Sequence, residues 1–334
     1  MQDVVKSPFD PNWRDDEFTL EALGFDLALP QATPNDGKLW VVKRHEAFEF
    51  AFGQPPKQYG QPRDVTSLVT RSPLVKHYVM VERSGVETST GDAVLDLVFP
   101  PKAWMSDNLQ ERCMMLAAAK ETSGRVLVGG LGLGVYPQML FALGRPVTSI
   151  TIVDESEDVI ALVHPQWMRN LTEQQRSQVS VVRQRIQSYA REVSQAERFD
   201  TIFLDIWNDA DPRWLPSANA VIAQCVPLCA PGGRILCWGY ALMVDAFVRD
   251  ALLYVEKEFP MAEFNLDPGL ERFGLWSSEH PTATTEERAA VARDIAITTT
   301  TEDDMYDREQ FLGSYAPSRA LAYVQMARAR KRPV

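Results

Sequence analysis

GRVLVGGLGLGVYPQMLFALGRPVTSITIVDE, residues 124–155, is the stretch that decides the fold. Within it, Val126–Val128 is an apolar run with the length and β-branching of a buried strand. A glycine-rich turn, 129–134, follows directly and opens a helical segment. A second β-rich run, 148–153, comes next. It ends on two acids, Asp154 and Glu155. Strand, glycine turn, helix, strand and terminal acid together predict the first half of a nucleotide-binding βαβ unit.

The glycine spacing helps to choose the ligand. Glycines let the backbone take positive φ and approach a ligand closely, and the next helix points its N-terminal amides at that ligand. The dinucleotide fingerprint is G-x-G-x-x-G, whereas Gly130, Gly132 and Gly134 give G-x-G-x-G. This spacing resembles motif I of class I S-adenosylmethionine-dependent methyltransferases. The competing interpretation is a tight βα turn that binds nothing.

The composition limits the partners. The 334 residues, with 45% hydrophobic and 24% charged side chains, indicate a globular protein with one large domain or a core domain with appendages. A net charge of −11 argues against general nucleic-acid binding, which needs a basic stripe, and favours a small or neutral substrate or a basic partner.

Further features bear on location and metals. No run approaches the roughly 18–20 apolar residues of a membrane span, and the polar first ten residues show no secretory signal. The four cysteines and four histidines show no metal-ligand spacing. We therefore predict a cytoplasmic protein with reduced thiols, no metal and no membrane partner.

Strands and helices alternate after the first βαβ unit. The predicted strands are 179–183, 199–204 and 234–240, and the predicted helices are 186–193, 215–228 and 243–259. This alternation predicts a doubly wound, mostly parallel α/β sheet. The second of these strands delivers Asp205 to the carboxyl edge, where open α/β sheets bind ligands. Asn265-Leu266 and 273–278 are predicted to form a closing hairpin, which makes the sheet seven-stranded.

These elements set the predicted domain limits. Residues 1–70, rich in Pro, Asp and Gln, predict an irregular N-terminal extension, and 71–103 predicts a small β-hairpin region. The Rossmann-like domain takes 104–279, and 280–334 predicts a helical C-terminal extension.

Residues 75–278 resemble the spermidine synthase-like branch of the class I methyltransferase fold. A β-hairpin and a helix precede VLVGGLGLG, and VDES, FDTIFLD and APGGRIL follow in order. The resemblance implies S-adenosylmethionine as cofactor, with Asp154 on the ribose and Asp205 as the catalytic residue. The residues implied to bind the cofactor are Gly130, Gly132, Gly134, Asp154, Glu155, Arg185, Ile186, Asp205 and Trp207.

The sequence departs from these families at several positions. Val128 stands where many methyltransferases carry an acid, and Gly132 stands where spermidine synthases carry an Asp in the turn. Gln184–Ile186 replaces the Gly-Asp pair that binds the adenine amino group. A guanidinium has donors only, so Arg185 cannot accept from that amine, although it can stack on the ring. Asp205 and Asp209 are spaced D-x-x-x-D, against the D-x-x-D pair of the polyamine enzymes.

Two more groups have two interpretations each. Asp107 and Glu111, before the glycine strand, either cap their helix or belong to the segment that covers the ligand pocket in many class I methyltransferases. Trp207, Tyr136 and Trp238 either wall the pocket or pack in the core.

Three functions are consistent with these features. The first is a methyltransferase of unknown acceptor, in which Asp205 holds the methionine amine or takes the proton of the nucleophile, because an activated sulfonium otherwise needs only in-line positioning. The second is an aminopropyltransferase, whose cationic polyamine suits the acidic charge. The third is a methyltransferase-like fold kept as a binding or structural module, which the departures at Val128, Gly132 and Arg185 favour. This third function predicts a stable homo-oligomer or complex and no cofactor binding.

Overall fold

The computed structural model describes residues 40–51, 57–70, 103–107, 109–193, 197–207, 210–257 and 268–301. The chain divides into two compact units. The described part of the first unit comprises the residues up to Trp207 together with 229–238, and that of the second comprises 210–228 and 239–301. The predicted limit between residues 279 and 280 falls inside the second unit.

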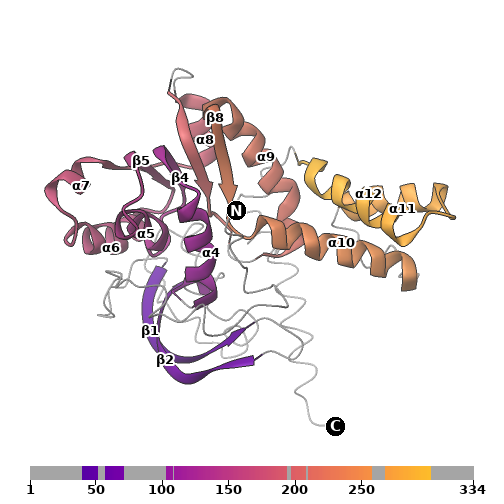
Figure 1. The fold of residues 1–334 in the computed structure, drawn as a ribbon, viewed down its shortest axis with the longest axis horizontal. Helices are drawn as coiled ribbons and strands as arrows, with labels where there is room; N and C mark the ends of the chain where they lie inside the picture. Colours follow the sequence, from indigo (N-terminus) through magenta and orange to yellow (C-terminus); the bar gives the residue numbers. More distant parts are fainter. Residues whose placement is uncertain are drawn as a thin grey trace, which may run out of the picture. The chain divides into compact units, whose positions relative to one another are not determined.

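A five-stranded parallel sheet forms the centre of the first unit (Figure 1). Its strands are β4 (Gly124–Gly129), β5 (Val147–Asp154), β6 (Val179–Arg183), β7 (Phe199–Leu204) and β8 (Cys229–Cys237). They lie in the order β6-β5-β4-β7-β8, and every neighbouring pair is parallel. The strand order therefore reverses at β4, and such a switch point is where open α/β sheets bind ligands. The predicted α/β class is confirmed.

Helices precede or connect these strands. They are α4 (Leu109–Lys120), α5 (Val135–Ala142), α6 (Glu157–Met168), α7 (Glu173–Ser177) and α8 (Ile186–Glu192). Val126, Leu127 and Val128 in β4 are each at most 1% exposed, so both faces of this strand are covered, as in other parallel sheets. Ser156 begins α6, because its side chain accepts the Val159 N–H at 3.3 Å.

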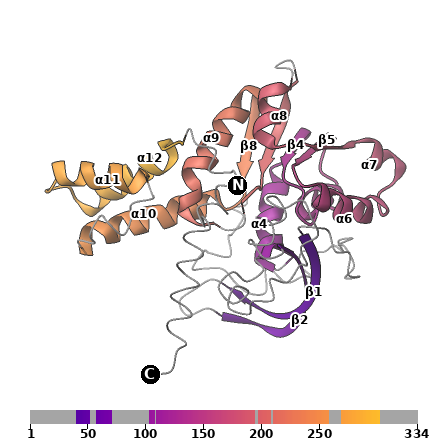
Figure 2. The same ribbon diagram turned by 180° about the vertical axis from the view of Figure 1, so that it is seen from behind.

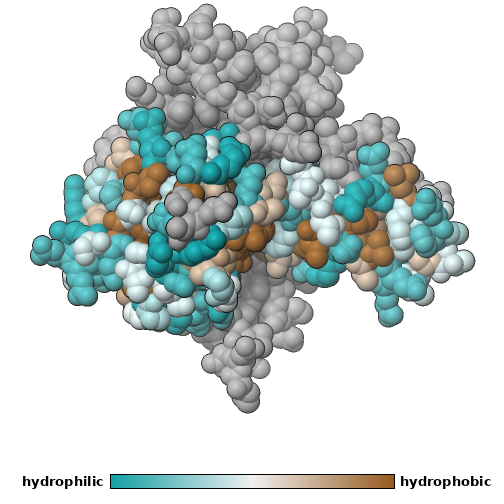
Figure 3. All heavy atoms as spheres, turned by 90° about the horizontal axis from the view of Figure 1, so that it is seen from above, coloured by the Kyte–Doolittle hydropathy of each residue, from teal (hydrophilic) through white to brown (hydrophobic). Residues whose placement is uncertain are grey.

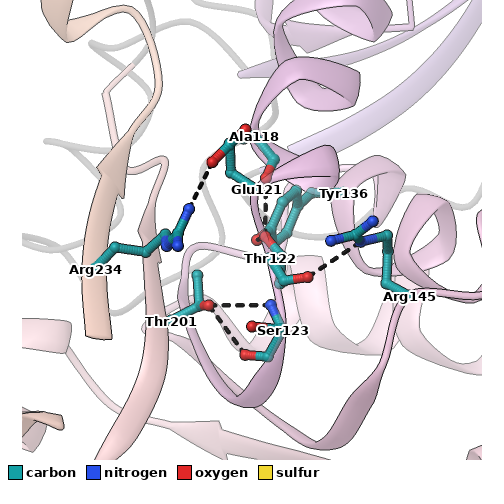
Figure 4. Close-up of polar contacts among 8 residues, drawn as sticks. All are labelled: Ala118, Glu121, Thr122, Ser123, Tyr136, Arg145, Thr201 and Arg234. Carbon is teal, nitrogen blue, oxygen red and sulfur yellow. Dashed lines mark hydrogen bonds and ion pairs between the residues drawn. The ribbon is translucent and has the colours of Figure 1, made fainter. Parts of the chain in front are cut away.

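A polar cluster joins the start of β4 to its neighbours (Figure 4). The Thr201 hydroxyl accepts the Ser123 N–H at 3.2 Å and donates to the Ser123 carbonyl at 3.0 Å. The hydroxyls of Thr122 and Tyr136 lie 2.6 Å apart, and the Tyr136 ring stacks on Phe203 with centroids 3.9 Å apart. Tyr136 is only 2% exposed, so it packs in the core.

The Pro-Gly-Gly sequence at 231–233 lies within β8. Phe199 pairs with Cys229 and Thr201 pairs with Arg234, so one residue of β7 faces the four residues 230–233. This bulge accommodates the Pro-Gly-Gly sequence, since Pro cannot donate to the ladder and Gly232 takes a φ of 78°.

The N-terminal part of the chain contains long strands. β1 (Trp40–Ala51), β2 (Lys57–Thr70) and β3 (Ala103–Ser106) form an antiparallel sheet in that order. The prediction that residues 1–70 have little regular structure is therefore wrong for β1 and β2. Gly60 and Pro62 in β2 are strand-breaking signals, and they lie at the register shift, where residues 60–62 face only residue 48 of β1. The two strands pair on both sides of this bulge. The predicted hairpin between residues 75 and 98 lies outside the described residues.

The second unit is helical. It contains the 3₁₀ turns η2 (Pro212–Trp214) and η3 (Val226–Leu228), and the helices α9 (Leu215–Cys225), α10 (Tyr240–Lys257), α11 (Pro268–Glu279) and α12 (Thr285–Thr298). Helices α10 and α12 lie side by side in both views (Figures 1 and 2). The predicted helices 215–228 and 243–259 correspond to α9 with η3 and to α10.

The predicted strand at 273–278 is wrong, because these residues belong to α11. Leu270, Phe273 and Ser277 are buried, and this helical spacing gives α11 one buried face. A short apolar run does not distinguish a strand from a buried helix, which explains the error. The described part of the parallel sheet has five strands rather than the predicted seven.

Hydrophobic residues (brown) stand in small groups among hydrophilic ones (teal) on the face shown in Figure 3. Among the described residues, the large hydrophobic side chains classed as exposed all lie in the second unit. They are Val226, Leu275 and Ile297.

Candidate functional site

The glycine turn follows β4 and contacts the residue that follows β7, Asp205. Gly130, Gly132 and Gly134 have φ values of 96°, 52° and 72°, which residues with a side chain rarely adopt. A Cβ on Gly130 would collide with the backbone oxygen of Asp205, and the Asp205 N–H donates to the Gly129 carbonyl at 2.9 Å. Asp205 is thus held beside the turn, as the sequence predicted for the carboxyl edge of the sheet.

Asp154 at the end of β5 also bonds to this turn. Its Oδ2 accepts the Leu131 N–H at 2.8 Å, and its Oδ1 accepts the Ser156 N–H at 2.8 Å. The acid predicted to bind a ribose is therefore fixed by the backbone that surrounds the predicted ligand.

The thioether of Met105 fills the space beside Gly132. Met105 lies on β3 and is 8% exposed. Its sulfur accepts the Leu133 N–H at 3.2 Å, and a Cβ on Gly132 would collide with it. Sequence reasoning missed this residue, because a methionine in a short strand carries no signal that separates it from ordinary core packing.

Two buried acids, Asp205 and Glu111, have pKa values well above the usual range of a carboxyl group. Burial raises the pKa of Asp205 to about 7. Burial first, and the nearby charge of Asp205 second, raise the pKa of Glu111 well above its usual value. The Trp238 side chain acts in the opposite direction on Glu111, because a nearby donor favours the ionised carboxylate. Within the described residues, Trp238 Nε1 is buried without a partner at hydrogen-bonding geometry.

Asp107 and Glu111, the two acids around the start of α4, have different partners. Asp107 forms a buried ion pair with Arg112 at 3.0 Å and also accepts the Arg112 Nε–H at its backbone oxygen, at 3.1 Å. Asp107 therefore fixes the start of α4. Glu111, 8% exposed, is the acid whose pKa the charge of Asp205 helps to raise.

The predicted adenine-binding residues form a separate group. Arg185 Nε lies 3.4 Å from Glu155 Oε2, and both side chains are about a third exposed, at 32% and 34%. Ile186 is 3% exposed and packs against Gly129 at the end of β4. The structure thus brings Glu155 and Arg185 together as an ion pair and places Ile186 in the core.

Trp207 packs beneath the end of β8. It is 2% exposed, and its Nε1 donates to the Trp238 carbonyl at 2.8 Å. The backbone N–H of Trp238 in turn donates to the Leu204 carbonyl at 2.9 Å. Trp207, two residues after Asp205 in the sequence, thus helps to hold the ends of β7 and β8 together.

Two further observations on the described residues concern metals and membranes. In that part of the chain, no group of three or more His, Cys, Asp and Glu side chains is arranged to hold a metal ion. Of the helices seen there, none has both the length and the apolar character that crossing a bilayer requires.

No protein-family model and no curated protein matches the chain. Among solved structures, the chain is 18% identical to precorrin 8W decarboxylase of Methanobacterium thermoautotrophicum, covering 42% of this chain and 69% of that one with a TM-score of 0.29. It is 19% identical to the N-methyltransferase NodS of Bradyrhizobium japonicum WM9, covering 38% of this chain and 64% of that one with a TM-score of 0.27. It is 18% identical to the SAH-bound methyltransferase PaMTH1 of Podospora anserina, covering 56% of this chain and 68% of that one with a TM-score of 0.31. Likenesses this low establish neither family nor activity, so a function for this chain has to be inferred from its strand order and site geometry.

Proposed function

We propose that this protein is a methyltransferase that uses S-adenosylmethionine. One observation carries the proposal: the Asp154 carboxylate bonds to the glycine turn at the switch point of the β6-β5-β4-β7-β8 sheet. This is the position at which open α/β sheets bind nucleotides, which supports a role for this acid in accepting hydrogen bonds from ribose hydroxyls.

The residues fit this cofactor at most positions. The turn of Gly130, Gly132 and Gly134 offers backbone that a ligand can approach, apart from the space beside Gly132 that Met105 fills. Asp154 would hold the ribose. The planar Arg185 guanidinium would stack on the adenine ring, with Glu155 and Ile186 beside it. Trp207 would support the part of the site that contains Asp205.

When bound, S-adenosylmethionine supplies a methyl group that is already activated on a sulfonium. The protein then has to align a nucleophile and, where that nucleophile carries a proton, to take the proton away. Asp205 suits this second task, since burial gives it a pKa of about 7 and a general base works best near the ambient pH. We therefore propose an acceptor whose nucleophilic atom carries a proton, such as an amine or a hydroxyl.

Two alternatives rest on specific observations. The Met105 thioether beside Gly132 favours a module that binds no cofactor and assembles into a homo-oligomer or complex. The finer spermidine synthase-like assignment, with aminopropyl transfer to a polyamine, is supported by Asp205, while its second acid, Asp209, lies outside the described residues.

Isothermal titration with S-adenosylmethionine and with S-adenosylhomocysteine tests the proposal. We expect dissociation constants in the micromolar range, about −8 kcal/mol of binding free energy. Absence of binding at millimolar ligand, together with a stable oligomer by light scattering, would favour the structural module. Turnover of putrescine with decarboxylated cofactor would instead favour the aminopropyltransferase.

A further inference from the structure

We propose that Met105 is a residue of the cofactor site and sets its affinity: the thioether occupies the space above the glycine turn, and the cofactor reaches the turn only after Met105 has moved. This inference rests on the proposed function.

The Leu133 amide is held by a weak partner. Leu133 lies in the glycine turn, one residue before Gly134, the N-cap of α5. Here the Leu133 N–H donates to Met105 Sδ at 3.2 Å. A thioether is a weak acceptor, so an oxygen atom of a ligand would bind this amide better than Met105 does. The existing bond is therefore one that a ligand can replace.

The space beside Gly132 is already filled. A glycine in a nucleotide-binding turn leaves room for the ligand to approach the backbone. At Gly132 that room is taken by the sulfur of Met105, with which a Cβ would collide. The absence of a side chain at this position therefore serves a contact within the protein, and a cofactor would need the same space.

Met105 combines a fixed backbone with a flexible side chain. Its backbone is fixed, because Met105 pairs with Leu68 of β2 and the buried Asp107–Arg112 ion pair follows two residues later. Its side chain, in contrast, is unbranched and has three rotatable bonds. The thioether can thus leave the turn by a change of rotamer while β3 stays in place.

Three variants separate this role from ordinary core packing. Met105→Ala removes the thioether and empties the space above the turn. Met105→Leu keeps most of the volume and removes the sulfur acceptor, and it serves if the alanine variant fails to fold. Met115→Ala is the matched control, because Met115 lies in α4, is 1% exposed and belongs to the same core.

The first measurement needs no cofactor. Hydrogen exchange at the Leu133 amide, followed by NMR and corrected for global stability, reports the bond to Met105 directly. We expect exchange to be at least about fivefold faster in both Met105 variants and unchanged in Met115→Ala. Equal exchange in all proteins would overturn the inference, because Met105 would then not cover the turn.

The second measurement is titration with S-adenosylhomocysteine. We expect Met105→Ala to bind at least about tenfold more tightly than the wild type, and Met115→Ala to bind as the wild type does. If the wild type binds and Met105→Ala binds no more tightly, the inference is wrong and the proposed function stands. If neither protein binds at millimolar ligand, the proposed function is wrong and the inference falls with it.

Discussion

Oδ2 of Asp154 lies 2.8 Å from the amide nitrogen of Leu131, so the acid that ends β5 is bonded to the glycine turn that follows β4. The other oxygen of Asp154 accepts the Ser156 N–H at the start of α6. One carboxylate thus joins two βα connections at the switch point of the sheet. Its position is set by these two backbone hydrogen bonds.

Replacing Asp154 by Ala is expected to have two effects. Two backbone amides lose a charged acceptor, which lowers the free energy of unfolding by about 1–3 kcal/mol. Cofactor affinity is expected to fall at least about tenfold, because the ribose loses one or two charge-assisted hydrogen bonds. Urea unfolding and calorimetric titration measure the two effects separately.

Glu157→Ala is the matched control for Asp154→Ala. Glu157 is an acid of the same βα connection, and its ion pair with Arg183 is exposed, at 70% and 61% of the two side chains. Such pairs contribute about 0–1 kcal/mol, so both stability and affinity should stay close to wild type. Unchanged affinity in Asp154→Ala would rule out its assignment to the ribose.

The pKa of Asp205 makes stability depend on pH. Burial raises this pKa from 3.8 to about 7, and the pKa of Glu111 is raised in the same direction. Between about pH 4 and 7 the folded protein therefore keeps a proton that the unfolded chain has released. The contribution of Asp205 to the free energy of unfolding is fully present below the ordinary pKa of 3.8. It is lost as the pH rises through the folded-state pKa of about 7.

Asp205→Asn removes this titration. From pH 5 to pH 8, the wild type should lose on the order of 1–3 kcal/mol of unfolding free energy relative to Asp205→Asn. Urea unfolding at four pH values in this range gives the difference. A difference that stays constant with pH would show that the folded protein does not retain the proton.

Arg185 tests the adenine side of the site. Arg185→Ala should change the free energy of unfolding by less than about 1 kcal/mol, because its ion pair with Glu155 is about a third exposed. Cofactor affinity should fall about three- to tenfold if the guanidinium stacks on the adenine ring. Arg185→Lys keeps the charge without the planar group, so full recovery of affinity in that variant would contradict stacking.

Asn219 in α9 bonds to two other helices of the second unit, α10 and α12. Its Nδ2 donates to the carbonyls of Ala296 and Thr299, at 2.8 and 2.7 Å, and its Oδ1 accepts from the Tyr240 hydroxyl. Asn219→Ala leaves these buried groups without their partner and should cost about 2–4 kcal/mol. Hydrogen exchange of the α12 amides should rise accordingly.

Thr298→Ala provides the comparison for Asn219→Ala. The Thr298 hydroxyl bonds to the Asp294 carbonyl at an exposed position of the same helix end, so its loss should change stability by less than about 1 kcal/mol. Equal effects of the two variants would show that Asn219 is not what holds the end of α12.

The sequence by itself determined the parallel sheet and the place of the site. Val126–Val128, the glycine turn and Asp154 follow one another within a single βαβ unit, and such local patterns depend little on the rest of the chain. The position of Asp205 at the carboxyl edge follows from the same rule, because an acid that ends a buried parallel strand must lie at that edge.

Other features were decided only by pairing and packing between elements. β1 and β2 pair on both sides of a bulge that contains Gly60 and Pro62, and 273–278 is helical and packs against α10 and α12, although local sequence preference did not indicate either outcome. The site depended on tertiary structure in the same way. The charge of Asp205 acts on Glu111, and Met105 covers the glycine turn, only after α4, β3 and the ends of β4 and β7 have packed together, since burial, proton affinity and the filling of a space are properties of that packing.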